Sequence, residues 1–457
     1  MTAPVARPRP ARRALDVLSL SVDETALQAH AARDPDWLTT DRRAAFDAWS
    51  SLPAETNMLY TPYIDLRAAQ LETAALITVP DPDRPDGSVP AEAAALLEIT
   101  DGAVTTAALS DDATAAGITL TDLRGLLTAD PARVQRLLAE GPGLAEDDKF
   151  AQLTRAAWAQ GAVVDVPDGV QLDRPIVIRW AIGAPDTALL TRTLVRVGAG
   201  ARVSIVEEFV PSAATDVDAE QGFFAGSMEV TVGDGASLQV ASLQELPANV
   251  VAIQHRVADI GEGATLQWAL AQLGGRLVRS RVDNRLVGDR SSVEQVEIVF
   301  GADAQLFDLT SYTTHIGKDT TGDLLSKAAL LEKSRTYLKG LITIERSANG
   351  TDSFLGEFGM NLSKDARSVA IPSLEIDQPD CRRAMHSSSV GPVDETQLFY
   401  LESRGIPPDE ARKFIVLGFL EPVVARVPLA SAQDRLRDLL EAKWIAGTDG
   451  IAGEAAA

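Results

Sequence analysis

Hydrophobic and polar residues alternate in short runs through the middle of the chain. Val163–Val166 and Leu338–Arg346 are two such runs, and glycine and aspartate separate them from their neighbours. Alternation with a period of two predicts β-strands that bury one face. This alternating pattern begins at Gly161, and Leu374–Ile376 is the last run that resembles a strand. The pattern therefore predicts a large β-rich body.

One short motif repeats within this body. Val197–Val203, Val232–Leu238 and Ile260–Leu266 each read as valine or isoleucine, then G-x-G-A-x, then valine or leucine. The glycines permit tight turns with positive φ, and the alanine lets neighbouring coils stack closely. A unit of this size cannot bury its own apolar face, but stacked units can. We predict a right-handed parallel β-helix (solenoid), with an ordinary sandwich containing coincidental turns as the alternative.

Helical patterns flank the body. Between Asp16 and Ala157, hydrophobic residues recur mainly at spacings near three and four, with a proline break at Pro53. A small strand pair, Ala94–Ile99 and Ala103–Leu109, interrupts this region. The predicted organisation is a disordered tail rich in Ala, Pro and Arg at 1–15, an N-terminal mainly helical domain at 16–160, a β-helix core at 161–380 and a C-terminal helical domain at 381–457.

The stretch Leu374–Pro422 joins the body to the C-terminal helices. Asp394 followed three residues later by Gln397 fits a capping pattern for a first helix, and Gly405 suits its end. Pro408 suits the start of a second helix. That helix carries an apolar stripe at helical spacing, formed by Ala411, Phe414, Ile415, Gly418 and Phe419. The stripe either packs on the body or another tail helix, or it docks a partner.

Charge and composition restrict the classes of function. The 457 residues carry a formal net charge of −23, which argues against nucleic acid or an anionic membrane as a partner. One cysteine excludes an internal disulfide framework. No apolar run approaches the roughly 20 residues of a membrane span, and the arginine-rich N-terminus lacks the apolar core of a secretory signal. We expect a protein of the reducing cytoplasm.

Motifs for binding nucleotides are missing from the sequence. The G-x-G turns lie between predicted strands, and no G-x-G-x-x-G opens a helix. Gly317-Lys318 lacks the upstream glycine of a phosphate loop because Tyr312 occupies that position. The sequence therefore predicts that this chain binds no nucleotide by itself.

Cys381 and His386 are the candidate metal ligands. Thiolate and imidazole both bind iron and zinc, but two ligands cannot complete a tetrahedral site. A metal here would be shared with another chain or held transiently; an inert loop thiol and a structural or solvent-exposed histidine are the alternatives. His315 is either a further ligand or a solenoid residue with satisfied hydrogen bonds. Seven acids are candidates for the paired carboxylates of a carbohydrate-active solenoid enzyme: Glu207, Glu208, Glu294, Glu297, Asp308, Asp319 and Asp323.

Several elements occur together in one order: Pro372–Ile376, His386, Gln397–Tyr400 and Ser403–Ile406. With Ser334–Asp352 and the G-x-G-A turns, they resemble the SufB/SufD family of iron–sulfur cluster assembly proteins. The resemblance covers more than half of the chain. The single cysteine and the N-terminal helical region are more similar to SufD than to SufB, whose chains carry additional cysteines.

The resemblance implies a scaffold subunit that is not an enzyme. Such a subunit pairs with a SufB-like paralogue through the solenoids and docks a SufC-like ATPase through its C-terminal helices. His386 is similar to the interfacial histidine of SufD, which implies a ligand of a transient shared iron–sulfur cluster. Some SufD chains have a cysteine where this chain has Ala384, and Cys381 is displaced from that position.

The residues expected to dock the ATPase are Tyr400, Arg404, Gly405, Phe414, Ile415 and Phe419. A SufB-like principal scaffold, or a homodimeric form, is the alternative within the family. A β-solenoid carbohydrate-active enzyme is the alternative from another class.

Overall fold

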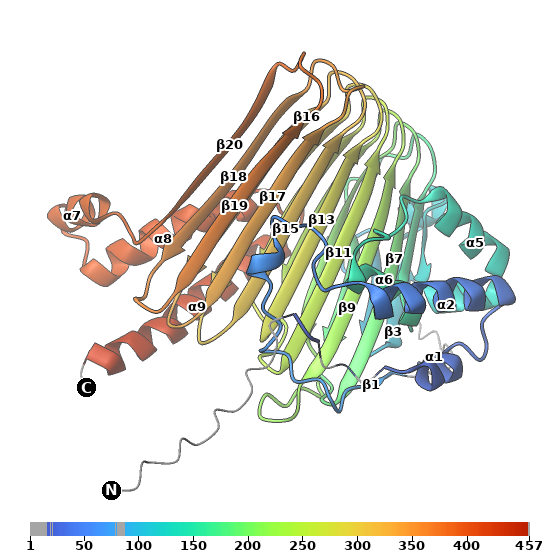
Figure 1. Ribbon diagram of the computed structural model, residues 1–457, viewed down its shortest axis with the longest axis horizontal. Helices are drawn as coiled ribbons and strands as arrows, with labels where there is room; N and C mark the ends of the chain where they lie inside the picture. Colours follow the sequence, from blue (N-terminus) through green and yellow to red (C-terminus); the bar gives the residue numbers. More distant parts are fainter. Residues whose placement is uncertain (1–15, 19, 21, 78, 80–86, 456–457) are drawn as a thin grey trace, which may run out of the picture.

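The computed structural model describes residues 16–455 except 19, 21, 78 and 80–86, with side chains as far as Ala446. The predicted tail at 1–15 lies outside the described residues. Two sheets run along the body (Figure 1), and consecutive strands alternate between them. Pairing within each sheet is parallel from coil to coil, so the body is a parallel β-solenoid of about eight turns. The predicted fold class is confirmed.

The first sheet, called sheet A, contains the odd-numbered strands of the solenoid. They are β5 (Ala162–Val166), β7 (Thr187–Val197), β9 (Gly222–Val232), β11 (Val250–Ile260), β13 (Leu277–Leu286), β15 (Leu306–His315), β17 (Arg335–Ile344) and β19 (Arg367–Ile376). The second sheet, sheet B, contains the even-numbered strands. They are β6 (Ile176–Ile182), β8 (Arg202–Pro211), β10 (Ser237–Gln244), β12 (Thr265–Gln272), β14 (Ser292–Gly301), β16 (Thr321–Leu330), β18 (Asp352–Asn361) and β20 (Arg383–Gly391).

The repeated G-x-G-A motif forms the turns between the two sheets. The three copies connect β7 to β8, β9 to β10 and β11 to β12. In the second copy, Gly235 has a φ of +66°, which L-residues rarely adopt. A Cβ on Gly233 would lie 2.8 Å from the backbone nitrogen of Ala199 in the preceding coil. The glycines are therefore needed for the turn and for close stacking, as the sequence predicted.

The N-terminal region is continuous with the solenoid. Its helices are α1 (Glu24–His30), α2 (Asp36–Ser51), η1 (Thr61–Tyr63), α3 (Asp111–Ala115), α4 (Leu123–Ala129), α5 (Pro131–Glu140) and α6 (Lys149–Ala157). Its strands are β1 (Ala75–Leu76), β2 (Ala95–Thr100), β3 (Ala103–Leu109) and β4 (Thr119–Asp122). The predicted strand pair is the antiparallel hairpin β2–β3, and β2 also pairs with β6. Because β4 pairs with β5, strands of this region cover the first coil in both sheets.

The C-terminal region contains one strand that the sequence did not predict. Leu374–Ile376 is not the last strand, because β20 pairs with β18 from Arg383 to Gly391. The strands thus continue past the predicted boundary at residue 380. Strand β20 lacks hydrophobic alternation because most of it faces solvent; its middle consists of three serines, Ser387, Ser388 and Ser389. The helices α7 (Glu395–Ser403), α8 (Pro408–Val424) and α9 (Ala430–Ala455) follow.

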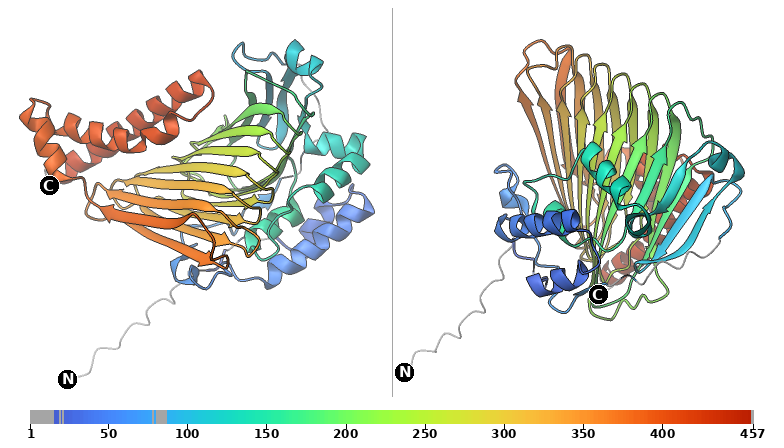
Figure 2. Two further views of the ribbon diagram at one scale, coloured as in Figure 1. Left: turned by 90° about the horizontal axis from the view of Figure 1, so that it is seen from above. Right: turned by 90° about the vertical axis from the view of Figure 1, so that its right-hand side faces the viewer.

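The two helical regions lie on opposite sides of the solenoid. Figure 2 shows α8 and α9 along sheet B, and the N-terminal helices against sheet A. Val416, Leu420 and Val423 of α8 are buried with Ala269 and Ile298 from the outer face of sheet B. Among the described residues, no helix is both long and apolar enough to cross a membrane.

Candidate functional site

The two ends of the solenoid differ. At the first coil, β4 covers β5 and the β2–β3 hairpin extends the sheet beyond β6. At the last coil, β19 and β20 are the outermost strands of sheets A and B, and among the described residues no further strand pairs with either (Figure 1). An edge strand presents backbone N–H and C=O groups that can pair with another chain. We call this last coil, formed by β19 and β20, the open end.

Loss of burial marks the open end. In β17 seven of ten residues are buried, as the pattern in that strand shows, whereas β19 and β20 contain no buried residue. The interior-facing side of β19 is nevertheless apolar. Leu374 and Ile376 are in register with the buried Ile342 and Ile344 of β17. The last coil therefore exposes its interior-facing side chains, whereas the corresponding side chains of each earlier coil are covered by the next coil.

His386 belongs to this interior-facing side. It pairs in register with Leu355, and the same position in each earlier coil of sheet B points into the core. The earlier members of this column are Ile176, Ile205, Val240, Trp268, Gln295, Leu324 and Leu355. All seven are buried, whereas His386 is exposed. The sequence identified this histidine, but its position in an interior column follows only from the register.

Cys381 lies in the turn before β20, five positions before His386 in the sequence. Its side chain is half-buried and packs against the cluster that contains Ile342 and Leu355. Within the described part of the chain, no group of three or more His, Cys, Asp or Glu side chains is placed to hold a metal ion. The structure thus offers ligands at the open end but no complete site from this chain.

The expected docking residues on the C-terminal helices fall into two groups. Tyr400 and Phe414 are 56% and 59% exposed, and Phe399, which sequence reasoning missed, is 70% exposed. The Arg404 guanidinium lies 5.2 Å from the centre of the Tyr400 ring. Gly405 has a φ of +87°, in the turn that ends α7. We call Phe399, Tyr400 and Phe414 the aromatic patch.

Ile415 and Phe419 are half-buried against the body. The amine of Lys327 donates a hydrogen bond to the carbonyl of Phe419 at 3.0 Å and lies 4.7 Å from the centre of its ring. The α8 helix packs mainly through Val416 and Leu420, which lie beside the predicted stripe. Because α8 is apolar around much of its circumference, hydrophobic spacing alone did not identify the buried face.

Most of the remaining candidates from the sequence have structural partners. His315 is buried, with Nδ1 2.8 Å from the Thr320 hydroxyl and Nε2 3.0 Å from the Ser353 hydroxyl. Burial lowers the pKa of His315 to about 4, so its imidazole is neutral. The acids form these contacts: Glu207 with Arg256, Glu208 with Arg179, Glu294 with Arg426, Glu297 with Gln272, Asp308 with Arg279 and Asp319 with Arg382.

The acids Glu294 and Asp323 are directly opposite each other on β14 and β16. They face α8, and Arg426, two residues after the end of that helix, pairs with Glu294. Burial and the nearby Glu294 carboxylate raise the pKa of Asp323. This pair lies beside a helix, and neither acid lines the clefts of about 590 and 400 Å³, which both lie along sheet A. The arrangement therefore gives no support to the carbohydrate-active alternative.

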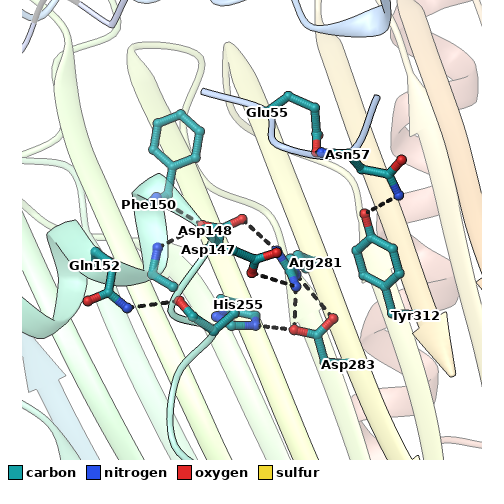
Figure 3. Close-up of polar contacts among 12 residues, drawn as sticks. Glu55, Asn57, Asp147, Asp148, Phe150, Gln152, His255, Arg281, Asp283 and Tyr312 are labelled. Atoms are coloured by element: carbon teal, nitrogen blue, oxygen red, sulfur yellow. Dashed lines mark hydrogen bonds and ion pairs between the residues drawn. The ribbon is translucent and has the colours of Figure 1, made fainter. Parts of the chain in front are cut away.

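A buried ionic cluster connects the N-terminal region to the outer face of sheet A (Figure 3). Arg281 of β13 donates to Asp148 at 3.0 Å and to Asp283 at 3.0 Å, and His255 lies 2.6 Å from Asp283. Burial alone would raise the pKa of Asp283, but Arg281 and His255 outweigh it and hold that pKa low. The members come from distant segments, so no local sequence motif could reveal the cluster.

The cluster continues toward the open end. Glu55 accepts a hydrogen bond from Arg279 at 2.9 Å. The side-chain amide of Asn57 donates to the Tyr312 hydroxyl at 3.3 Å (Figure 3). A cleft of about 590 Å³ lies between these loops and sheet A, reaching Glu375 on β19. Its arginines are already paired with acids. We therefore infer that the cluster holds the N-terminal region against the solenoid.

These features define a class: a parallel β-solenoid with helical ends, a covered first coil and an uncovered last coil. The family model described as "SUF system FeS cluster assembly, SufBD core domain" matches residues 180–419, which is just over half of the chain. The chain belongs to this family of iron–sulfur cluster assembly proteins.

Curated relatives agree with that assignment. The chain is 27% identical over 444 residues to the iron–sulfur cluster assembly protein SufD of Bacillus subtilis, covering 93% of this chain and 98% of that protein. It is 28% identical over 293 residues to an iron–sulfur cluster assembly SufBD family protein of Staphylococcus epidermidis, covering 64% of this chain and 62% of the relative. A SufBD family protein of Staphylococcus aureus is 27% identical over the same length. The match along nearly the whole of SufD confirms the predicted resemblance to that branch.

Proposed function

We propose that this chain is a scaffold subunit in iron–sulfur cluster assembly that pairs with a SufB-like paralogue at the open end. The observation that carries the proposal is the position of His386. It lies on the interior-facing side of a last coil that no described strand covers. A second solenoid placed against this coil would enclose the imidazole between two chains.

Pairing at the open end has a simple physical basis. The backbone groups along the outer edges of β19 and β20 can accept another strand, which adds main-chain hydrogen bonds. The same contact would cover Leu374, which is half-buried, and Ile376 and Val390, which are exposed in the single chain. Since the first coil is already covered, pairing is expected between last coils, with the two N-terminal regions pointing away from each other.

The iron–sulfur cluster is the cargo of this assembly. A neutral imidazole is a good ligand for iron, and one histidine leaves the remaining positions for other ligands. In the proposed complex these ligands come from the paralogue and from sulfide. Cys381, which is half-buried in the turn before β20, is the second candidate in this chain.

The aromatic patch is the proposed docking surface for a SufC-like ATPase. Phe399, Tyr400 and Phe414 are exposed on α7 and α8, whereas Leu420 anchors α8 to sheet B. Large exposed aromatic side chains are typical anchors of protein interfaces. Helices that are anchored on the solenoid and dock an ATPase would transmit movement from that ATPase to the scaffold.

Replacing His386 with alanine tests the proposal. The substitution removes an exposed side chain, so folding and pairing should be unchanged, while cluster yield in the reconstituted complex falls. The matched control is Ser388→Ala, two residues further along the same side of β20. Equal cluster yield from His386→Ala and wild type would remove His386 from the site.

Purification with candidate partners tests the assembly itself. We expect a stable complex that contains this chain, a paralogue richer in cysteine and an ATPase. A homodimer without the paralogue would favour the alternative form within the family. Recovery of neither species, under conditions where the paralogue and ATPase are folded, would contradict the proposal.

A further inference from the structure

Glu357 is a buried acid in the coil next to the open end. It lies on β18 and is 1% exposed. Its register partners in sheet B are Ser326 of the preceding coil and Ser388 of the last coil. The same column contains Ile178 and Leu270 in the solenoid core, so Glu357 also points inward.

Each oxygen of the Glu357 carboxyl group has a defined neighbour on sheet A. One oxygen accepts a hydrogen bond from the backbone N–H of Ile371 in β19 at 2.8 Å. The other oxygen lies over Gly340, where an added Cβ would come within 2.8 Å of it. A residue with a side chain at position 340 would therefore displace Glu357 or the neighbouring Leu355.

Among the described residues, no cation forms an ion pair with Glu357. Burial raises its pKa to about 8 despite the hydrogen bond from Ile371, so the group is mainly protonated at neutral pH. Of the deeper glutamates of the same column, Glu207 pairs with Arg256 at 2.7 Å. Glu297 resembles Glu357, because it accepts a hydrogen bond from the neutral Gln272 at 3.1 Å and burial raises its pKa, but it lies two coils further from the open end than Glu357. An acid buried without a charge partner is costly, and such groups concentrate at functional sites.

Glu357 and His386 share one side of sheet B. Because Leu355 is opposite His386 and Glu357 is two residues further along β18, the two side chains are diagonal neighbours. Adjacent strands lie about 4.8 Å apart and two residues span about 6.6 Å, which places the two Cα atoms about 8 Å apart. Side chains at that spacing, on one side of the sheet, can reach a common ion.

We propose that Glu357 is a second ligand from this chain, adding a carboxylate oxygen to the His386 imidazole in a site for a divalent iron ion at the open end. The inference rests on the proposed function, because it assigns a further ligand to the same site. Imidazole and carboxylate together suit ferrous iron. On binding, the carboxyl proton leaves to solvent and the ion supplies the positive charge that the apo pocket lacks. The remaining ligands come from water or the paralogue.

A purely structural role for Glu357 makes a different prediction. If the side chain only holds Ile371, Glu357→Gln should behave as wild type, since the glutamine carbonyl still accepts that hydrogen bond. If the carboxylate binds the ion, the same substitution removes a ligand while keeping the fold. Glu297→Gln is the matched control, because it changes an interior glutamate of the same column two coils deeper.

The test is titration with Co²⁺, as a coloured substitute for ferrous iron, and then with Fe²⁺ without oxygen. It is done on the full chain alone and in complex with its paralogue. We expect Glu357→Gln and His386→Ala each to weaken binding at least tenfold and to alter the visible Co²⁺ spectrum, while Glu297→Gln leaves both unchanged. Glu357→Asp, which keeps the carboxylate on a shorter side chain, should retain part of the affinity.

Three outcomes would overturn the inference. They are wild-type affinity and spectrum in Glu357→Gln, an equal loss in Glu297→Gln, and a wild-type chain that binds neither ion at the open end. Failure of the chain to form a complex with the paralogue is scored separately by gel filtration. That failure would contradict the proposed function, whereas an intact complex with an unaffected Glu357→Gln would contradict only the inference.

Discussion

Acidification tests whether His315 is held as a neutral imidazole inside the solenoid. Both ring nitrogens have hydroxyl partners, Thr320 and Ser353, and burial lowers the pKa to about 4 from an ordinary value of 6.5. Between these two values the unfolded chain binds a proton that the folded chain does not. Stability therefore falls as pH decreases from about 6.5 to about 4. The difference of about 2.5 pKa units corresponds to about 3 kcal/mol.

The assay compares urea unfolding of wild type and His315→Asn at several pH values between 4 and 8. At pH 7.5 the variant should be less stable by roughly 1–3 kcal/mol, because hydrogen bonds are lost and the side chain is smaller. Between pH 7 and pH 4, the free energy of unfolding of the wild type should fall by about 3 kcal/mol relative to that of the variant, because only the wild type carries the histidine. Other titrating groups are common to both proteins and cancel. A stability difference that is independent of pH would refute the reasoning.

Three further substitutions test separate parts of the structure. Phe414→Asp should abolish ATPase binding in a pull-down without lowering the melting temperature. Val217→Asp, at an equally exposed site on a distant loop, should bind the ATPase normally. Binding by Phe414→Asp would show that the aromatic patch is not the docking surface. Leu420→Ala should cost about 2–5 kcal/mol in chemical unfolding because the side chain is fully buried between α8 and sheet B; a loss below 1 kcal/mol would mean that α8 is held elsewhere. Arg281→Met should cost about 3–5 kcal/mol, since Asp148 and Asp283 both lose the guanidinium that pairs with them at 3.0 Å; an unchanged midpoint would contradict the charge pairing in the cluster.

Parts of this fold could be predicted from the sequence because they depend on interactions within a few consecutive residues. The G-x-G-A motif requires a glycine with positive φ at Gly235 and a missing side chain at Gly233, so it predicts both the turn and close stacking. The end of α7 at Gly405 follows from the same conformational preference. Asp394 is the N-cap of α7, as predicted, and its carboxylate accepts from the backbone N–H of Thr396. Each of these features depends on a few consecutive residues.

Other features depend on distant parts of the chain and could not be predicted in this way. Strand β20 lacks hydrophobic alternation because most of it faces solvent, so only its register with β18 defines it. The cluster around Arg281 joins residues as distant in the sequence as Glu55 and Lys339, whose side chains lie 3.7 Å apart. For His386, the sequence indicated a ligand type, but the coil register was needed to place it in an interior column beside Glu357. Exposure of the last coil is likewise a property of the whole solenoid.

Hydrogen–deuterium exchange on addition of the SufB-like paralogue tests the central claim most directly. If the chain pairs at the open end, the backbone amides of β19 and β20 should gain strong protection, because edge groups become part of a continuous ladder. Amides of β5 and β6 in the covered first coil should be unchanged. Protection elsewhere in a stable complex, with exchange in β19 and β20 unaltered, would contradict the account.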